Sequence, residues 1–311
     1  MKLHHVVEAQ QFDRDTLMDL FDASRRMEGV AKAGGVTGYQ NRIMAALFYE
    51  PSTRTRFSFE AAMHRLGGRV IATENASEFS SVSKGETLED TIRIMNGYAD
   101  LIVIRHFEVG AARRAADVSR VPVINAGDGV GQHPTQALLD LYTIQKEIGG
   151  IDGLQIAMVG DLAQGRTVRS LAYLLGKFTG VKIHFVAPDL LKMKEDILAY
   201  LREHEVSFEE GKDLDAVLPK VNVVYQTRIQ KERFGDRIAD YERCRGLYVL
   251  DSASLKLLRR DAIVMHPLPR IDEIAREVDA DPRAAYFRQA QNGLYVRMAV
   301  LEMLLVPTAR D

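Results

Sequence analysis

The sequence predicts an α/β protein with two doubly wound domains, each built on a central parallel sheet flanked by helices. Its 311 residues exceed the usual domain size of about 150 residues, so two domains are expected. Short apolar runs alternate with segments of helical periodicity, and the runs are apolar throughout, as in strands buried on both faces of a parallel sheet. The composition, 46% hydrophobic and 27% charged, is that of a folded chain rather than a disordered or fibrous one.

Eight apolar runs are the expected strands of the two sheets. Helix-length segments separate most of them, which is the spacing that right-handed crossovers between parallel strands require. The expected strands are residues 43–48, 70–73, 101–104, 121–125, 155–159, 182–186, 221–225 and 262–265.

Three helical segments bear on the domain organisation. Residues 13–27 place Leu17, Leu20, Phe21 and Ser24 on one face of an amphipathic helix. Residues 134–147 begin with a proline and end before Gly149-Gly150. Residues 285–306 form a long and mostly apolar helix.

We expect the second of these helices to run from one sheet to the next, and the third to cross back to the first domain. The chain offers no Pro/Ser-rich linker or repeat that would place the boundary elsewhere. The predicted domains are therefore residues 1–134 plus 285–311, and residues 135–284.

Charge and cysteine content restrict the partners and the compartment. The 41 Lys and Arg residues against 43 Asp and Glu residues leave a net charge of −2, so no global field favours nucleic acid or an anionic membrane. The single cysteine, Cys244, cannot form an intrachain disulfide or a cysteine-rich zinc site. The N-terminus lacks the apolar stretch of a signal peptide, and no apolar run approaches the length of a membrane span. A cytoplasmic protein is expected.

The strongest local motif follows the first expected strand. Ser52, Thr53, Arg54 and Thr55 lie between that strand and a helical pattern that continues through Phe57. Backbone N–H groups at a helix N-terminus bind anions, hydroxyls add donors, and an arginine fork suits phosphate. The alternative interpretation is an ordinary Ser/Thr cap followed by solvated arginines.

A second motif, residues 160–167, joins the strand 155–159 to a helix. It nearly matches a phosphate-binding P-loop, but Arg166 stands where that loop requires lysine. A guanidinium at a helix start suits a carboxylate, so Arg166 is predicted to clamp one on the substrate. The alternative is a glycine-tightened turn with an exposed arginine.

Two further motifs contain histidine and proline. His133 precedes a helix that starts at Pro134, and glycines at 127, 129 and 131 would let a ligand approach the backbone. We expect His133 to be neutral and to donate a hydrogen bond. The run His266-Pro267-Leu268-Pro269-Arg270 follows the last strand, where a rigid loop presents carbonyl oxygens and a cis X-Pro bond is possible. The alternatives are a packed or solvated histidine at 133 and a simple strand terminator at 266–270.

Basic residues also end other strands. Arg105 follows 101–104, and Arg228 with Gln230 follows 221–225, so parallel topology brings them to the same edges as the motifs. The run 77–85, with Ser80, Ser83 and Lys84, has no periodicity and is predicted to be a loop.

Together these motifs resemble those of the aspartate/ornithine carbamoyltransferase family. Ser52-Thr53-Arg54-Thr55 is similar to the family's carbamoyl-phosphate motif, and His133-Pro134-Thr135-Gln136 with residues 266–270 matches its aspartate branch. Length and motif order agree along essentially the whole chain. The resemblance implies transfer of a carbamoyl group from carbamoyl phosphate to the amine of L-aspartate, giving N-carbamoyl-L-aspartate and phosphate in pyrimidine synthesis, with no metal or cofactor.

The resemblance also implies a role for each site residue. Residues 1–134 plus 285–311 would bind carbamoyl phosphate, and residues 135–284 would bind aspartate. The phosphate of carbamoyl phosphate would be bound by Ser52, Thr53, Arg54 and Thr55, and its carbonyl oxygen by Thr55, Arg105 and His133. The carbamoyl amide would be bound by Gln136 and the backbone carbonyls of Pro267 and Leu268. The carboxylates of aspartate would be bound by Arg166, Arg228, Gln230 and Lys84.

The family's shared active site implies a homotrimer. Ser80 and Lys84 would reach the site of a neighbouring subunit, which makes Lys84 a catalytic residue supplied by another chain. Ser83 departs from relatives that carry a second lysine there. Regulatory chains or a dihydroorotase are possible further partners, whereas nucleic acid and membranes are not expected.

Three alternatives stay open at this point. Ornithine carbamoyltransferases share the first motif but usually have cysteine where Pro267 stands, and they lack the Lys84 loop. A nucleotide-binding protein would use Arg166 and the acidic Asp251. An inactive scaffold homologue would be expected to have lost one of Arg54, Arg105, His133 or Arg228, all of which are present.

Overall fold

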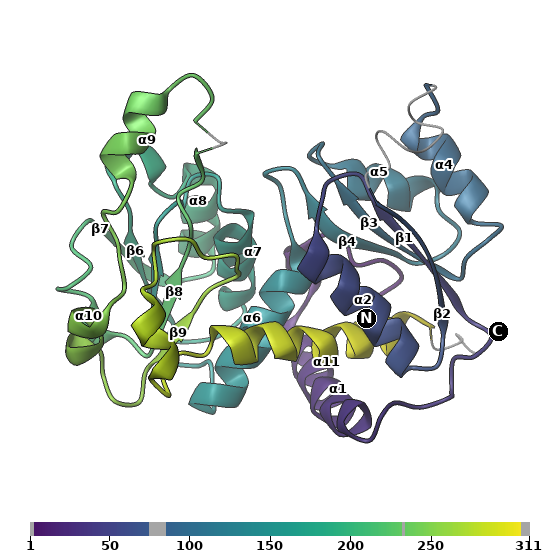
Figure 1. The fold of residues 1–311 in the computed structure, drawn as a ribbon, viewed down its shortest axis with the longest axis horizontal. Coiled ribbons are helices and arrows are strands. Elements are labelled where there is room, and N and C mark those ends of the chain that lie inside the picture. Colours follow the sequence, from purple (N-terminus) through teal and green to yellow (C-terminus); the bar gives the residue numbers. More distant parts are fainter. Residues whose placement is uncertain (1–2, 75–84, 232–233, 306–311) are drawn as a thin grey trace. The chain divides into compact units, whose positions relative to one another are not determined.

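The structure is a computed structural model that describes residues 3–74, 85–231 and 234–305 (Figure 1). The chain divides into two compact units: unit 1 consists of Met1–Leu139 with Gln291–Asp311, and unit 2 of Asp140–Ala290. Helices α6 (Pro134–Ile148) and α11 (Tyr286–Leu305) each contain one of the two boundaries. Unit 1 is therefore formed by two separate stretches of sequence.

Unit 1 contains a four-stranded parallel sheet in the order β2-β1-β3-β4. Its strands are β1 (Ile43–Phe48), β2 (Arg69–Glu74), β3 (Leu101–His106) and β4 (Val123–Asp128). The N-terminal segment adds to the free side of β4, where the Val6 N–H donates to the Val123 carbonyl at 2.8 Å.

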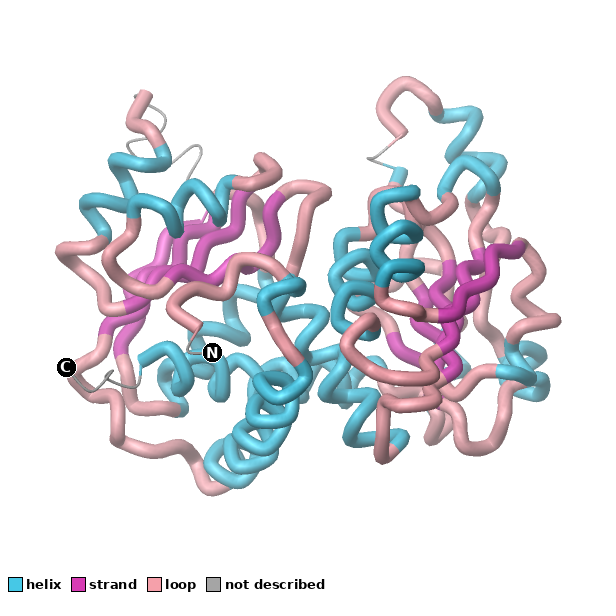
Figure 2. The backbone as a smooth tube through the Cα atoms, turned by 180° about the vertical axis from the view of Figure 1, so that it is seen from behind, coloured by secondary structure: helices cyan, strands magenta, loops and turns pink. Residues whose placement is uncertain are grey.

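Helices cover both faces of this sheet (Figure 2). On one face, α4 (Leu88–Met95) and α5 (Ala111–Val118) pack against Ala45 and Leu47 of β1. Side chains alternate along a strand, so Met44, Ala46 and Phe48 point to the opposite face. They are fully buried there, on the side of α1 (Arg14–Lys32) and α2 (Thr53–Arg65). The central strand β1 is buried on both faces, as its apolar sequence predicts.

Unit 2 contains a five-stranded parallel sheet in the order β7-β6-β5-β8-β9. The strands are β5 (Gln155–Val159), β6 (Lys182–Val186), β7 (Ser207–Gly211), β8 (Val223–Gln226) and β9 (Ile263–Met265). The helices of this unit, besides parts of α6 and α11, include α7 (Arg166–Leu175), α8 (Glu195–Glu203), α9 (Ile238–Cys244) and α10 (Ser252–Leu257).

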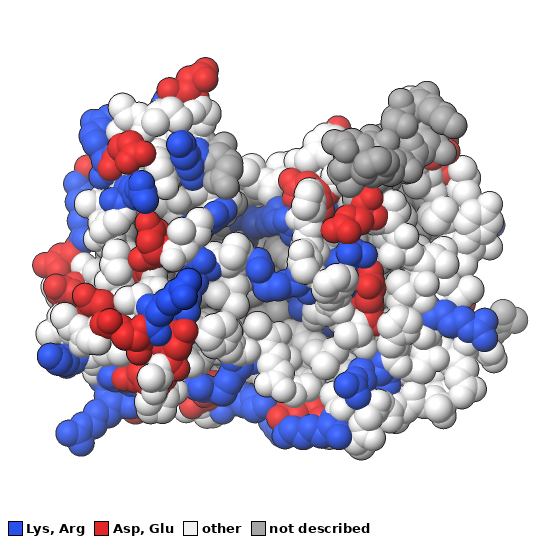
Figure 3. All heavy atoms as spheres, in the orientation of Figure 1, with Lys and Arg blue, Asp and Glu red and all other residues white. Residues whose placement is uncertain are grey.

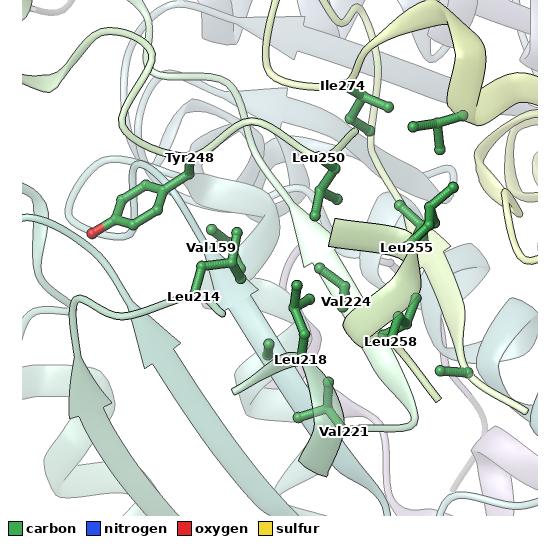
Figure 4. Packing of buried hydrophobic residues seen from close by; sticks show 14 of the residues in the cluster. Val159, Leu214, Leu218, Val221, Val224, Tyr248, Leu250, Leu255, Leu258 and Ile274 are labelled. Carbon is green, nitrogen blue, oxygen red and sulfur yellow. The ribbon is translucent and has the colours of Figure 1, made fainter. Parts of the chain in front are cut away.

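The core on one side of this sheet is mainly aliphatic, with Tyr248 and Tyr286 as its aromatic members (Figure 4). Val159 and Val224 from the central strands meet Leu218, while Leu255 and Leu258 approach from α10 and the residues after it. Tyr225, the neighbour of Val224 in β8, points the other way and its hydroxyl reaches Asp140 of α6. Unit 2 is thus also a sheet with helices on both faces, and the predicted fold class is confirmed.

Two features of the sheets differ from the expectation. Strand β7 was missed because four of its five residues are exposed at the sheet edge, so its sequence SFEEG carries no apolar run. Strand β2 was expected to be buried on both faces, but none of its residues is fully buried and four of six are exposed. Like β7, β2 is an edge strand with a neighbour on one side only, but its sequence is apolar.

Candidate active site

The strand order creates a switch point in each sheet. In unit 1 the chain passes from β1 to β2 on one side, then returns to β3 on the other side of β1. In unit 2 it passes from β5 to β6 and β7 on one side, then returns to β8 on the other side of β5. Connections that leave neighbouring strands in opposite directions open a crevice at their carboxyl ends, where doubly wound proteins bind ligands. The segments that follow β1, β3, β5 and β8 are therefore the candidate sites.

The turn after β1 leads into a helix whose N-terminus has no side-chain cap. Ser52 occupies the N-cap position of α2, yet its side chain makes no capping hydrogen bond. An ordinary Ser/Thr cap would use that hydroxyl to satisfy the first N–H groups of the helix. The geometry therefore favours an anion site over a simple cap, with Thr53 exposed and Thr55 buried in the first turn.

The two arginines of this turn are in different situations. Arg56 forms ion pairs with Glu60 at 3.3 Å and Glu74 at 2.9 Å. Arg54 has no ion pair with a described residue, and partial removal from water lowers the pKa of its guanidinium, which stays charged at neutral pH. Arg54 thus remains the stronger candidate for an anion ligand, whereas Arg56 is tied to its own helix and to β2.

Arg105 lies at the carboxyl end of β3, in register with Phe48 at the end of β1. Its Nη1 donates to the Ala126 carbonyl at 3.3 Å, and its Nη2 lies 3.3 Å from an Oε2 of Glu50. Glu50 stands two residues before Ser52 in the same turn. The structure therefore brings Arg105, 14% exposed, to the turn that carries Ser52 to Thr55.

The segment between β4 and α6 holds His133 and Gln136. The Gly129 N–H donates to the His106 carbonyl at 2.9 Å, and a Cβ at Gly129 would lie 2.5 Å from the Phe107 carbonyl oxygen, so only glycine fits. His133 is buried, and its carbonyl accepts the Gln136 N–H at 3.0 Å in the first turn of α6. Both residues thus follow the strand next to β3 in unit 1.

The turn after β5 carries Arg166 in unit 2. Gly160 has φ +109°, and a Cβ there would lie 2.5 Å from the Thr227 carbonyl oxygen. Glycine is required because the turn after β5 presses against the segment after β8. Gly165 precedes α7 without a side-chain cap, and Arg166 is the first residue of that helix.

Arg228 and Gln230 follow β8 in the same unit. Thr227 ties this segment to β5, since its N–H and its hydroxyl both donate to the Val159 carbonyl, at 2.9 and 2.8 Å. Arg228 and Gln230 are both half-buried. The predicted aspartate ligands Arg166, Arg228 and Gln230 therefore follow two adjacent strands at the switch point of unit 2.

The segment after β9 is held by the side chain of His266. The Leu268 N–H donates to its Nδ1 at 2.7 Å, so the proton resides on Nε2, which donates to Glu273 at 2.8 Å. Burial lowers the pKa of His266, in agreement with a neutral ring. Leu268 has φ +54° and its bond to Pro269 is cis, the form that the sequence allowed here. The carbonyls of Pro267 and Leu268 belong to this constrained segment.

Some of the predicted residues cannot be placed, and other residues were not predicted. Ser80 and Lys84 lie in 75–84, outside the described residues. Glu50 was overlooked because a lone glutamate beside a proline carries no pattern, although its position in the turn motif was a usable signal. Asp140, Tyr225 and Gln289, which form a buried polar network, were also overlooked. Asp140 and Tyr225 each lie singly within an apolar segment, and Gln289 lies among other polar residues at the start of α11, so none of the three forms a recognisable motif.

One face of unit 2 carries charged side chains of both signs. On the face shown in Figure 3, acidic and basic side chains are intermixed over unit 2.

Within residues 3–74, 85–231 and 234–305, no three His, Cys, Asp or Glu side chains gather in the way a metal ion would need. No helix among these residues has the length and apolar character needed to cross a bilayer.

Comparison with known proteins decides the family. Residues 4–146 match the family model of the carbamoyl-P binding domain of aspartate/ornithine carbamoyltransferases, and residues 152–304 match the model of the Asp/Orn binding domain. The chain belongs to the aspartate/ornithine carbamoyltransferase family. The resemblance carried by the four motifs is confirmed.

Relatives of this carbamoyltransferase include proteins of plants, archaea and Dictyostelium discoideum. The chloroplastic aspartate carbamoyltransferase of Oryza sativa is 61% identical over 98% of this chain and 86% of its own length. The aspartate carbamoyltransferase catalytic subunit of Thermoplasma acidophilum is 52% identical over 98% of this chain and 99% of its own. The multifunctional protein pyr1-3 of Dictyostelium discoideum is 48% identical, but the match spans only 13% of that protein.

Solved structures of the family share the fold of this carbamoyltransferase. Aspartate transcarbamoylase from Trypanosoma cruzi in complex with N-(phosphonacetyl)-L-aspartic acid superposes with a TM-score of 0.92 at 43% identity, covering 97% of this chain and 96% of that one. The catalytic subunit of the M. jannaschii enzyme gives 0.90 at 47% identity, covering 97% and 98%.

Proposed function

We propose that this chain transfers the carbamoyl group of carbamoyl phosphate to the amine of L-aspartate, forming N-carbamoyl-L-aspartate and phosphate. The observation that carries the proposal is the uncapped start of α2 beside the guanidinium of Arg105, at the switch point of a carbamoyl-P binding domain. Relatives at 52% to 62% identity over nearly the whole chain are named aspartate carbamoyltransferases, which supports aspartate as the acceptor.

The carbamoyl phosphate binds to unit 1 in this proposal. Its phosphate lies at the start of α2, where Ser52, Thr53 and Arg54 supply hydroxyls and a guanidinium to the leaving group. Negative charge develops on the carbonyl oxygen as the amine attacks, and Thr55, Arg105 and His133 donate to it. The C–N bond forms, the C–O bond to phosphate breaks, and one amine proton is released.

The carbamoyl amide needs acceptors because its nitrogen carries two protons. The side-chain oxygen of Gln136 and the carbonyls of Pro267 and Leu268 take this role. The constrained backbone after β9 supports it, because carbonyls held in one orientation need little rearrangement when the substrate arrives.

Aspartate binds through its two carboxylates. Arg166 at the start of α7 and Arg228 after β8 are the clamps, with Gln230 beside Arg228. A bidentate fork at an uncapped helix start suits a carboxylate. Residues 1–134 plus 285–311 are proposed as the carbamoyl-phosphate domain and residues 135–284 as the aspartate domain.

The assembly is a proposal that rests on the family. A homotrimer lets Ser80 and Lys84 of one subunit complete the site of its neighbour, where Lys84 adds a cation for aspartate. Regulatory chains or a dihydroorotase remain possible partners, and the multifunctional name of the Dictyostelium relative is in keeping with the latter. A cytoplasmic location is proposed from the single cysteine, while the plant relatives are named chloroplastic.

Ornithine is the acceptor that the proposal must exclude. Arg166, Arg228 and Lys84 are cations that suit a dicarboxylate and repel the ammonium of the ornithine side chain. Steady-state assays of the purified chain with each amine test this, with separation of carbamoyl aspartate from citrulline. Citrulline formation at a rate comparable to that of carbamoyl aspartate would contradict the assignment.

A further inference from the structure

A buried polar network connects several elements of unit 2. Asp140 of α6 and Tyr225 of β8 are fully buried, and Gln289 of α11 is 1% exposed. Polar groups at this depth are costly unless each is hydrogen-bonded, and a carboxylate is the costliest of them. None of the three residues belongs to the motifs that predicted the substrate sites.

Asp140 is the centre of the network. Its Oδ2 accepts the hydroxyl of Tyr225 at 2.6 Å, and its Oδ1 accepts Nε2 of Gln289, also at 2.6 Å. The Oε1 of Gln289 accepts the backbone N–H of His266 at 2.9 Å. On the other side, the side chain of Thr167 hydrogen-bonds to the Tyr225 hydroxyl.

Each link has a fixed polarity. A backbone N–H can only donate, so Gln289 must turn its oxygen toward His266 and its amide nitrogen toward Asp140. Burial and the charge of Asp140 raise the pKa of Tyr225 well above its usual value, so the phenol keeps its proton for the carboxylate. The network therefore has one hydrogen-bond arrangement rather than several.

The two ends of the network lie beside proposed substrate ligands. His266 immediately precedes Pro267 and Leu268, and Thr167 immediately follows Arg166. One buried carboxylate is thus connected to the segment that offers carbonyls to the carbamoyl amide and to the helix start that carries an aspartate clamp.

We propose that Asp140, through Gln289 and Tyr225, is a positioning residue that holds the Pro267-Leu268 segment and the start of α7 at a fixed separation. The inference rests on the proposed function, because it assigns the two ends to the two substrates. The network would raise the rate by orienting the substrates. Reacting groups held in one geometry react far faster than loosely held ones, and a displacement of about 1 Å can cost about a hundredfold in rate.

A reciprocal exchange of amide and carboxylate tests the link between Asp140 and Gln289. Asp140→Asn places an amide nitrogen against the amide of Gln289 or the hydroxyl of Tyr225, and Gln289→Glu places two carboxylates together. In the double variant, the new amide at position 140 donates to the new carboxylate at position 289, and its oxygen still accepts the Tyr225 hydroxyl. The carboxylate at position 289 still accepts the His266 N–H, so these three hydrogen bonds are restored with the same net charge.

The expected result is a rescue of turnover. Each single variant should lower kcat by about tenfold to a hundredfold at a temperature where it is fully folded, and the double variant should return to within about threefold of the wild-type value. Hydrogen exchange at the backbone amides of His266 and Leu268 should accelerate in the single variants and recover in the double variant.

A matched hydroxyl deletion serves as the control. Tyr225→Phe removes only the phenol hydroxyl of the network. Tyr200→Phe removes a phenol hydroxyl elsewhere in unit 2, which donates to the Tyr173 carbonyl at 3.1 Å. Tyr225→Phe should lower kcat several-fold, and Tyr200→Phe should leave it unchanged while lowering the melting temperature.

The outcomes are distinguishable. Single variants with lowered melting temperature but wild-type kcat would show a merely structural network and overturn the proposal, as would a double variant no better than the single ones. If the wild-type chain makes no carbamoyl aspartate, the proposed function fails instead. Hydrogen exchange still tests the network in that event, and unchanged exchange at the His266 and Leu268 amides in Asp140→Asn would overturn it independently.

Discussion

The guanidinium of Arg105 and the carboxylate of Glu50 form an ion pair at 3.3 Å that joins the ends of two adjacent strands in unit 1. Arg105 lies at the carboxyl end of β3 and Glu50 follows β1, and the Tyr49 N–H donates to the Arg105 carbonyl at 2.9 Å. The pair orients the Arg105 guanidinium beside the uncapped start of α2. The Glu50 carboxylate is 30% exposed, so water weakens its attraction for the guanidinium. An incoming anion therefore meets a guanidinium that is already directed to the turn.

Arg105→Lys should lower kcat/KM for carbamoyl phosphate by about a hundredfold or more. Lysine keeps the charge but cannot contact the Ala126 carbonyl, Glu50 and a substrate oxygen with one rigid fork. Glu50→Gln removes only the orienting charge and should cost less than about tenfold. Steady-state kinetics decide the order, and a larger loss from Glu50→Gln than from Arg105→Lys would refute this account.

Arg54→Ala should lower turnover by orders of magnitude while the fold stays intact, because the leaving phosphate loses its guanidinium. Arg56→Ala is the matched control, since Arg56 is engaged by Glu60 and Glu74. It should reduce turnover by less than about tenfold. The measurement is kcat, with circular dichroism to verify folding, and near wild-type turnover of Arg54→Ala would count against the phosphate site.

Lys84 should act on the site of a neighbouring subunit. Mixtures of inactive Lys84→Ala and inactive Arg54→Ala chains, denatured and refolded together, should regain activity, because some hybrid interfaces combine an intact Lys84 with an intact Arg54. A lysine that acts within its own chain predicts inactive hybrids, and a solvated linker predicts that Lys84→Ala is active from the start. Carbamoyl aspartate formed per hybrid trimer separates the three outcomes.

His5 should make unit 1 less stable in mild acid. The Val123 N–H donates to its Nδ1 at 3.0 Å, and burial together with the nearby His4 and Arg113 lowers the pKa of His5 from 6.5 to about 4. Between pH 6.5 and about 4, His5 is protonated in the unfolded chain but stays neutral in the folded chain. The free energy of unfolding therefore falls as the pH drops through this range.

The variant His5→Gln provides the comparison for this pH dependence. Its amide oxygen can accept the same N–H, and it does not titrate. Wild type should lose of the order of 1 kcal/mol relative to the variant across this range, a value reduced because His5 is only half-buried. Urea unfolding at several pH values measures the difference, and parallel pH profiles would rule out the effect.

Prediction from sequence succeeded where local pattern and burial coincide. β1, β5 and β6 have the bounds that their apolar runs predict, because strands inside a parallel sheet are mostly apolar. β7 was missed because Ser207–Gly211 lies at an edge, where polar side chains are tolerated. The turn motif at Ser52 to Thr55 was found because a strand, hydroxyls and a helix start are consecutive in sequence.

The sequence by itself determined the fold class, most of the strands and the carbamoyltransferase resemblance, because these depend on periodicity and on motifs of a few consecutive residues. Only the tertiary structure decided which strands are neighbours, and with them the two switch points and the pairing of Arg105 with Glu50. It also decided the partners of Asp140, which lie 85 and 149 residues away. No local pattern specifies such partners, since a buried carboxylate is stabilised by whichever donors the packing of separate elements brings within about 3 Å.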